Sequence, residues 1–136
     1  MIRKGSAVWN GSLKEGKGTV SLESGVLKDA QYSFKTRFEN GNGTNPEELI
    51  GAAHAGCFSM QLAAMLTEEG FKPEELKTTS EITFEDKEVK KSHLVLQANV
   101  PGIEKDKFDK IAQKAKETCP LSKLLKAEIS LDYTLK

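Results

Sequence analysis

The chain has 136 residues, which is enough for one domain with a hydrophobic core but not for two. Its 20 basic and 20 acidic residues give a formal net charge of +0, which argues against a nucleic-acid partner and against a polybasic membrane-binding surface. The opening MIRKGSAVWNG lacks the apolar region of a secretory signal, so we expect a reducing, cytoplasmic location. There the two cysteines are expected as thiols, not as a permanent disulfide.

The first third of the chain is expected to form three strands. A strand through residues 8–10 ends at an Asn-Gly hairpin signal, residues 19–22 return, and residues 31–39 alternate apolar and polar side chains. This pattern places Arg37 in the middle of a strand. Of the 20 basic residues only Arg3 and Arg37 are arginine, which favours a need for the planar guanidinium at position 37, with an ordinary exposed strand position as the alternative.

A long central helix is expected next. Asn45 suits the N-cap, Pro46 the first helical position and Glu48 the third, and Gly70 suits the C-terminal end. The run from 49 to 66 carries no formal charge and reaches the length of a membrane-spanning helix. Because it contains glycines, a histidine, a serine and a glutamine, it predicts a helix buried in protein, with Cys57 near its middle and no membrane partner.

In the second half of the chain, apolar and polar side chains again alternate along expected strands. Residues 78–85 and 93–100 predict a hairpin with a charged tip at 85–91, and a second helix is expected from near Glu104, with an apolar stripe that ends at Cys119. Pro120 should break that helix and start a short new one, and residues 129–135 predict a final strand. The expected order is β-β-β-α-β-β-α-β, a single α+β domain over residues 1–136 with mainly antiparallel pairing.

Several side chains in this framework are able to carry chemistry. Cys57 is either a small buried hydrophobe or a nucleophile, and Cys119 lies where the start of the next helical turn would stabilise a thiolate. Only one of Glu47 and Glu48 is needed for the helix cap, which leaves Glu47 unexplained. His54 precedes Cys57 by three residues, so a Cys-His nucleophile or a metal pair stays open. No further ligands show a diagnostic spacing, and we expect no metal.

The segment GTNPEELIGAAHAGCFSM resembles the signature of the OsmC/Ohr family, the osmotically inducible and organic-hydroperoxide-resistance proteins. The resemblance covers nearly the whole chain, is nearest to the OsmC branch, and is least distinctive over residues 71–96. Other segments that carry it are KGSAVWNGSLKEGKGTVSLESGVL, YSFKTRFENGN and VPGIEKDKFDKIAQKAKETCPLSKLLKAEISLDYTLK. It implies the OsmC-like fold, an intertwined homodimer in which antiparallel sheets wrap long central helices, with two active sites at the subunit interface.

The same resemblance implies a thiol-dependent peroxidase that reduces organic hydroperoxides, and hydrogen peroxide less selectively, in defence against oxidative and osmotic stress. The family's peroxidatic cysteine falls on Cys57, its resolving cysteine on Cys119, its arginine on Arg37 and its glutamate on Glu47. It further implies an intramolecular disulfide and an external dithiol reductant, for which a lipoyl-bearing protein is the family analogue. No cofactor is expected. The alternatives are a module that binds a small hydrophobic ligand without turnover, and a Cys-His hydrolase.

Helix geometry adds a condition on this site. Glu47 and Cys57 are ten residues apart, so on one straight helix they are separated by about 15 Å and point to different faces. One guanidinium cannot touch both unless the helix breaks near Gly51 or Gly56, or unless two subunits share the site. We predict sharing, with Arg37 meeting a cysteine of the other chain.

Overall fold

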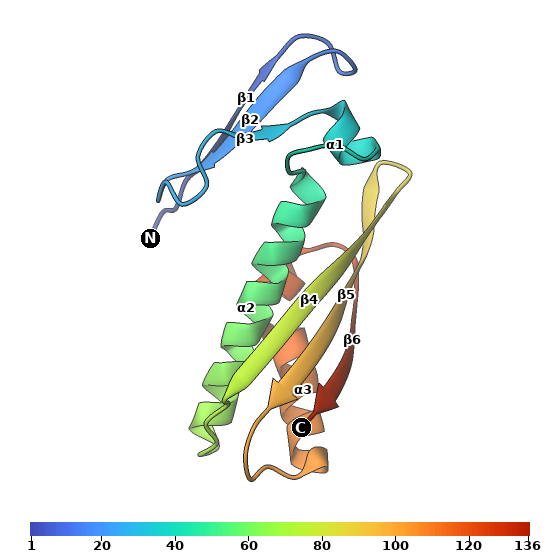
Figure 1. The fold of residues 1–136 in the computed structure, drawn as a ribbon. Coiled ribbons are helices and arrows are strands. Elements are labelled where there is room, and N and C mark those ends of the chain that lie inside the picture. The colour runs from blue at the N-terminus through green and yellow to red at the C-terminus, as the bar shows by residue number, and fades with distance from the viewer. The chain divides into compact units, whose positions relative to one another are not determined.

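The computed structural model describes residues 1–136 and confirms the α+β class (Figure 1). The chain forms two compact units, Met1–Leu49 and Ile50–Lys136. The elements up to the second helix are β1 (Gly5–Asn10), β2 (Lys17–Leu22), β3 (Ala30–Tyr32), α1 (Phe34–Phe38) and α2 (Pro46–Glu68). Those that follow are β4 (Glu75–Glu85), β5 (Glu88–Asn99), α3 (Lys105–Thr118), α4 (Pro120–Leu124) and β6 (Glu128–Leu135).

The N-terminal unit is built on an antiparallel sheet of order β1-β2-β3. The hairpin expected from the Asn-Gly signal is confirmed, because β1 pairs antiparallel with β2, and the connection between them runs from Gly11 to Gly16. Close packing across β2 requires a glycine, because a Cβ at Gly18 would lie 2.5 Å from the Tyr32 ring and 2.6 Å from the Trp9 ring. Those two rings pack with their centroids 5.3 Å apart.

The third predicted strand is shorter than expected, and Arg37 lies on a helix instead. β3 ends at Tyr32, and Ser33 then begins α1 through a capping box. The Thr36 N–H donates to Ser33 Oγ at 3.3 Å, and the Ser33 N–H donates to Thr36 Oγ1 at 2.8 Å. These local hydrogen bonds satisfy backbone groups that the strand alternation would have paired in a sheet, so the mid-strand placement of Arg37 is corrected.

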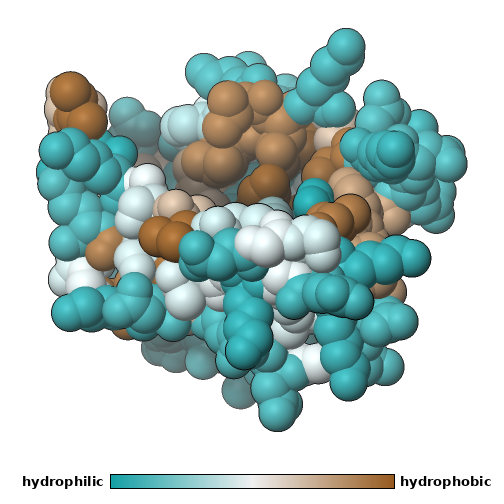
Figure 2. Space-filling model, turned by 90° about the horizontal axis from the view of Figure 1, so that it is seen from above, coloured by the Kyte–Doolittle hydropathy of each residue, from teal (hydrophilic) through white to brown (hydrophobic).

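The N-terminal unit has almost no core of its own. Within Met1–Leu49 only Gly18 and Thr36 are buried. Large apolar side chains there remain open, among them Val8 at 58% and Val26 at 88% exposure. Figure 2 shows that hydrophobic groups, drawn in brown, lie at the surface on one face of the protein. A three-stranded sheet needs a covered apolar face to be stable, so this unit requires a further packing surface.

Helix α2 is continuous from Pro46 to Glu68, and its ends follow the predicted signals. The Glu48 N–H donates to Asn45 Oδ1 at 2.8 Å, which confirms the N-cap. Gly70 has a φ of +87°, and the Phe71 N–H donates to the Leu66 carbonyl at 2.9 Å, which confirms the glycine end.

By length and composition alone, α2 is long and apolar enough to cross a membrane. The core helix of a soluble protein passes the same test, and the fully buried α2 side chains form part of the hydrophobic core of the C-terminal unit. These side chains are Phe58, Leu62 and Leu66. Their packing against the sheet and α3 identifies α2 as a core helix.

The C-terminal unit contains a sheet of order β4-β5-β6. β4 and β5 are antiparallel and joined at Asp86 and Lys87, both with positive φ, so the expected tip at 85–91 is a tight turn between longer strands. β5 and β6 are parallel, and they are the exception to the mainly antiparallel pairing that the sequence predicted and the other three strand pairs confirm. The crossover through α3 and α4 returns the chain to its original direction, which permits this parallel pair.

The predicted inner set lies on one face of β5 and directly after its end, and Leu94, Leu96, Ala98 and Val100 are all buried. They pack with the buried side chains of α2 and α3 into one cluster. In Figure 1, α2 and α3 run alongside this sheet. The predicted apolar stripe of α3 is confirmed in full, and its buried members are Phe108, Ile111, Ala112, Ala115 and Cys119. This packing fixes the helices that carry the two cysteines.

Candidate active site

The two cysteines meet within the C-terminal unit. Cys57 is half-buried on α2, and Cys119 is fully buried at the break between α3 and α4. Cys119 has a ψ of 127° because the residue before a proline avoids helical dihedrals, so Pro120 ends α3 as predicted. Both cysteines are free, and the Cys119 side chain lies near enough to Cys57 to act on the pKa of its thiol. The break between α3 and α4 therefore places the Cys119 side chain against α2. Its sulfur makes no capping hydrogen bond to α4.

The surroundings of Cys57 favour its protonated form. Burial raises the pKa of the Cys57 thiol, and the neighbouring Cys119 raises it further by accepting its hydrogen bond and through charge repulsion. The Leu121 backbone N–H opposes this rise by donating to the Cys57 sulfur. Because a thiolate is the nucleophilic form, a cation brought to this sulfur would activate it.

His54 does not pair with Cys57. Its Nδ1 lies 2.6 Å from Ser92 Oγ and its Nε2 lies 2.7 Å from Ser122 Oγ, so both ring nitrogens are occupied by serine hydroxyls. The ring is fully buried, and burial lowers its pKa, which favours the neutral form. The Cys-His nucleophile left open by the sequence is therefore wrong, and His54 belongs to a buried polar network.

Arg37 and Glu47 form a bidentate ion pair within the N-terminal unit. Arg37 Nε donates to Glu47 Oε1 and Arg37 Nη2 donates to Glu47 Oε2, each at 3.1 Å. Asn45 ties the two helix starts together by donating from Nδ2 to the Thr36 carbonyl at 3.0 Å. The Glu47 side chain, which the helix cap did not explain, holds the guanidinium by its planar fork. The scarcity of arginine in the sequence signalled this fork.

A small aromatic hollow of about 250 Å3 lies beside this ion pair, and the sequence reasoning missed it. Its lining consists of Arg37, Ser33, Leu13 and four aromatic side chains, Trp9, Tyr32, Phe34 and Phe38. They come from β1, the loop after it, β3 and α1, so only the folded sheet and helix bring them together. The aromatic alternation around Arg37 was the available signal, but it was assigned to a strand face.

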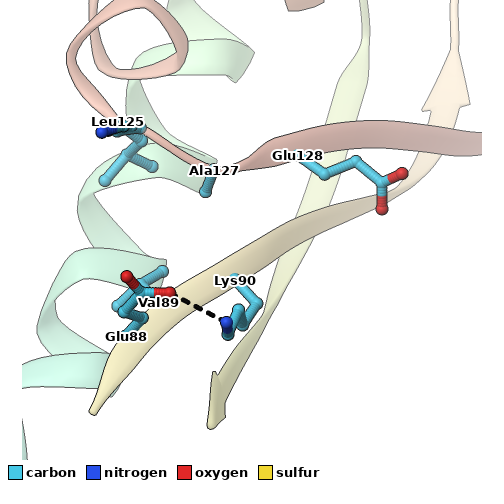
Figure 3. Close-up of a pocket in the computed structure, with 7 residues that line it drawn as sticks. Glu88, Val89, Lys90, Leu125, Ala127 and Glu128 are labelled. Carbon is cyan, nitrogen blue, oxygen red and sulfur yellow. Dashed lines mark ion pairs between the residues drawn. The ribbon is translucent and has the colours of Figure 1, made fainter. Parts of the chain in front are cut away.

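A second hollow, of about 650 Å3, opens between the start of β5 and the segment that leads from α4 into β6 (Figure 3). Glu88 and Lys90 form an ion pair of 2.8 Å on its β5 side, and Leu125, Ala127 and Glu128 line the other. It contains no cysteine or histidine. Across the chain, no group of three or more histidine, cysteine or acidic side chains is placed to hold a metal ion.

The α+β fold thus contains two neighbouring free cysteines and, elsewhere in the chain, an arginine held by a glutamate, as in proteins that carry out thiol redox chemistry. The family model of OsmC-like proteins matches residues 39–134, and the chain belongs to this family. It is 54% identical over 138 residues to peroxiredoxin OsmC of Escherichia coli (strain K12), covering 98% of this chain and 96% of that protein. The resemblance stated from the sequence is confirmed.

More distant relatives agree. The chain is 31% identical over 97 residues to an organic hydroperoxide resistance protein of Xanthomonas axonopodis pv. citri (strain 306), covering 70% of this chain and 68% of that one. The fold matches the crystal structure of an OsmC-like protein from Mycoplasma pneumoniae at 12% identity, with a TM-score of 0.78 over 99% of this chain and 97% of the other. It also matches Bacillus subtilis OhrB at 22% identity, with a TM-score of 0.65 over 98% of both chains.

The first prediction concerns the thiol pair. The substitution Cys119→Ala removes the hydrogen-bond acceptor and the charge that raise the pKa of Cys57, so that pKa should fall relative to the unsubstituted protein. The rate of Cys57 alkylation against pH, followed by mass spectrometry, measures it. Leu124→Ala, at an exposed α4 position, is the control and should leave the profile unchanged. An unchanged or raised Cys57 pKa in Cys119→Ala would contradict the contact.

Proposed function

We propose that this chain is a cysteine-based peroxidase that reduces organic hydroperoxides, and hydrogen peroxide, with Cys57 as the nucleophile. One observation carries the proposal. Two free cysteines lie next to each other in the core of a chain that is 54% identical to a protein named peroxiredoxin OsmC. The relatives named organic hydroperoxide resistance proteins support the substrate class.

The chemistry runs in three balanced steps. The Cys57 thiolate attacks the O–O bond, the alkoxide leaves and takes up a proton as an alcohol, and the sulfur becomes a sulfenic acid. The Cys119 thiolate then attacks the Cys57 sulfur, a disulfide forms, and water is released. A dithiol reduces the disulfide to two thiols and is itself oxidised to a disulfide. A lipoyl-bearing protein fits this last role.

Arg37 is proposed to supply the cation that Cys57 lacks, with Glu47 fixing its orientation. A guanidinium at the sulfur would lower the pKa of the thiol and stabilise charge on the leaving oxygen. Since α2 runs unbroken through Gly51 and Gly56, Glu47 and Cys57 stay about 15 Å apart along one helix. The unbroken helix gives no bend that would bring Glu47 and Cys57 together on one chain. It supports a shared site, with an Arg37 contributed by the second subunit.

A homodimer is proposed as the assembly, with residues 1–136 acting as one domain within it. An uncharged stripe of small residues and one methionine lies exposed on α2, at Ala52, Gly56, Met60 and Ala64. Met60 is 77% exposed, and nothing lies within 4 Å of a Cβ added at Gly56. Such a stripe lets a second helix approach closely, and the uncovered N-terminal sheet offers a further surface for a partner chain. The location proposed is the cytoplasm, where dithiol reductants are maintained.

The aromatic hollow beside Arg37 supports organic hydroperoxides as the preferred class. Its aromatic walls suit a hydrocarbon group, and the guanidinium at its edge suits the peroxide oxygens. Hydrogen peroxide has no apolar part to occupy such walls, so it should react less efficiently.

The second prediction tests the activity. Cys57→Ser should abolish peroxide consumption driven by a dithiol, and Cys119→Ser should stop after one turnover with Cys57 as a sulfenic or higher acid. Unsubstituted protein should instead show a Cys57–Cys119 disulfide by mass spectrometry. Thr79→Ser, on the exposed side of β4, is the control and should turn over normally. Full turnover in Cys57→Ser would refute the peroxidase. Retained binding of an apolar ligand without turnover in unsubstituted protein would favour the ligand-binding module.

The third prediction tests the assembly. Gly56→Leu has room in the isolated chain but would place a bulky side chain at the exposed stripe of α2, so it should shift the protein from dimer to monomer. Sedimentation equilibrium measures the shift. Lys114→Leu, at an exposed position on α3, is the matched control and should remain dimeric. A Gly56→Leu protein as dimeric as the control would contradict the α2 interface.

A further inference from the structure

A chain of polar side chains crosses the interior of the C-terminal unit. Ser80 on β4 lies 2.7 Å from Ser92 on β5, Ser92 lies 2.6 Å from His54 on α2, and His54 lies 2.7 Å from Ser122 on α4, measured between side-chain oxygens and ring nitrogens. His54 and Ser92 are fully buried. Burying His54 and Ser92 in the core is unfavourable unless their polar atoms are hydrogen-bonded, and the network that they form with the half-buried Ser80 and Ser122 joins α2, α4, β4 and β5.

The end of this network lies next to the two cysteines. His54 precedes Cys57 by three residues on α2, and Ser122 follows Cys119 by three residues. On the other side of the pair, Gln61 Nε2 donates to Thr118 Oγ1 at 2.9 Å, which joins α2 to the last turn of α3. Two polar contacts therefore bracket the thiol pair along the helices.

Helix α4 depends on such a contact for its position. It has only five residues, no side-chain cap and no buried residue. Leu121 packs partly against the core, and its backbone N–H is the donor that reaches Cys57. With so little packing, a hydrogen bond from His54 to Ser122 is a strong constraint on where α4 lies.

We propose that His54 is a positioning residue which, through Ser122, holds α4 so that the Leu121 N–H stays on Cys57. The effect of this positioning on catalysis rests on the proposed peroxidase activity. His54 touches neither the peroxide nor the sulfur. The neutral ring donates through one nitrogen and accepts through the other, and this suits it to join two hydroxyl groups.

The experiment compares two substitutions at one position. Ser122→Ala removes the hydroxyl, and Ser122→Thr keeps it. Ser59→Ala is the matched control, because Ser59 on α2 makes a similar contact, 2.7 Å to Thr78 Oγ1, with β4 instead of α4. For each protein, Cys57 alkylation is followed against pH, and formation of the Cys57–Cys119 disulfide is timed after one equivalent of cumene hydroperoxide. Thermal unfolding of each protein is measured alongside.

Ser122→Ala should raise the apparent pKa of Cys57 and slow disulfide formation by about five- to tenfold, the size of effect that one hydrogen bond exerts on an equilibrium. Ser122→Thr and Ser59→Ala should match the unsubstituted protein. Unchanged values in Ser122→Ala, an equal effect in Ser59→Ala, or a failure of Ser122→Thr to restore them would each overturn the proposal. Should Ser122→Ala fail to fold, His54→Asn, which keeps a donor and an acceptor on a shorter side chain, should shift the same two readouts in the same direction, and no shift would overturn it.

The alkylation profile keeps this inference separate from the proposed function. It reports the surroundings of Cys57 whether or not the protein reduces peroxides. Loss of peroxide turnover in the unsubstituted protein would refute the peroxidase, while an unchanged profile in Ser122→Ala would refute the positioning role.

Discussion

The arrangement of the C-terminal unit can be understood from the proximity of Cys57 and Cys119. Two distant parts of the chain must be placed correctly to bring these cysteines together. Helix α2 supplies one sulfur from an uncharged core segment, and the proline-induced break between α3 and α4 turns the other sulfur towards it. The β5 side chains pack on both helices and hold them together. A chain with the same cysteines but without Pro120 would continue α3 as a helix and direct the second sulfur elsewhere.

The contact also has an electrostatic consequence. Burial raises the pKa of the Cys57 thiol, which protects it from indiscriminate oxidation but leaves it unreactive by itself. The guanidinium of Arg37, held at two points by Glu47, is a cation prepared for such a sulfur. In our account, activation waits until the second subunit brings this fork to Cys57. A site shared between two subunits explains why the N-terminal unit has so little core of its own. It also explains why α2 exposes an uncharged stripe.

Much of the C-terminal unit could be predicted from the sequence, because the core decides it. The alternation of β5 and the apolar stripe of α3 are long periodic patterns, and burial follows them. The break at Pro120 and the ends of α2 follow from backbone chemistry that one or two residues determine. The pairing of β6 could not be read in this way, since strand direction depends on where the preceding helices return the chain.

The N-terminal unit was harder to predict for a related reason. Between Ser33 and Phe38 a strand pattern and a capping box compete, and the local hydrogen bonds decide in favour of the helix. In the site, the sequence singled out the two cysteines, Arg37 and Glu47, the family resemblance supplied their roles, and the structure places Arg37 on Glu47 and Cys119 near Cys57. The aromatic hollow was missed because most of its residues were assigned to a strand face, and the His54 network was missed because it joins residues far apart in sequence.

The central claim is that two subunits complete each site, and complementation between two inactive variants tests it most directly. Arg37→Ala and Cys57→Ser chains with different affinity tags are produced together, and the mixed dimer is purified and assayed for dithiol-driven peroxide consumption. If Arg37 serves the cysteine of its partner, one site of the mixed dimer is intact and about half of the unsubstituted activity should return. A mixed dimer as inactive as either parent would show that Arg37 and Cys57 must lie on the same chain, and would contradict the account.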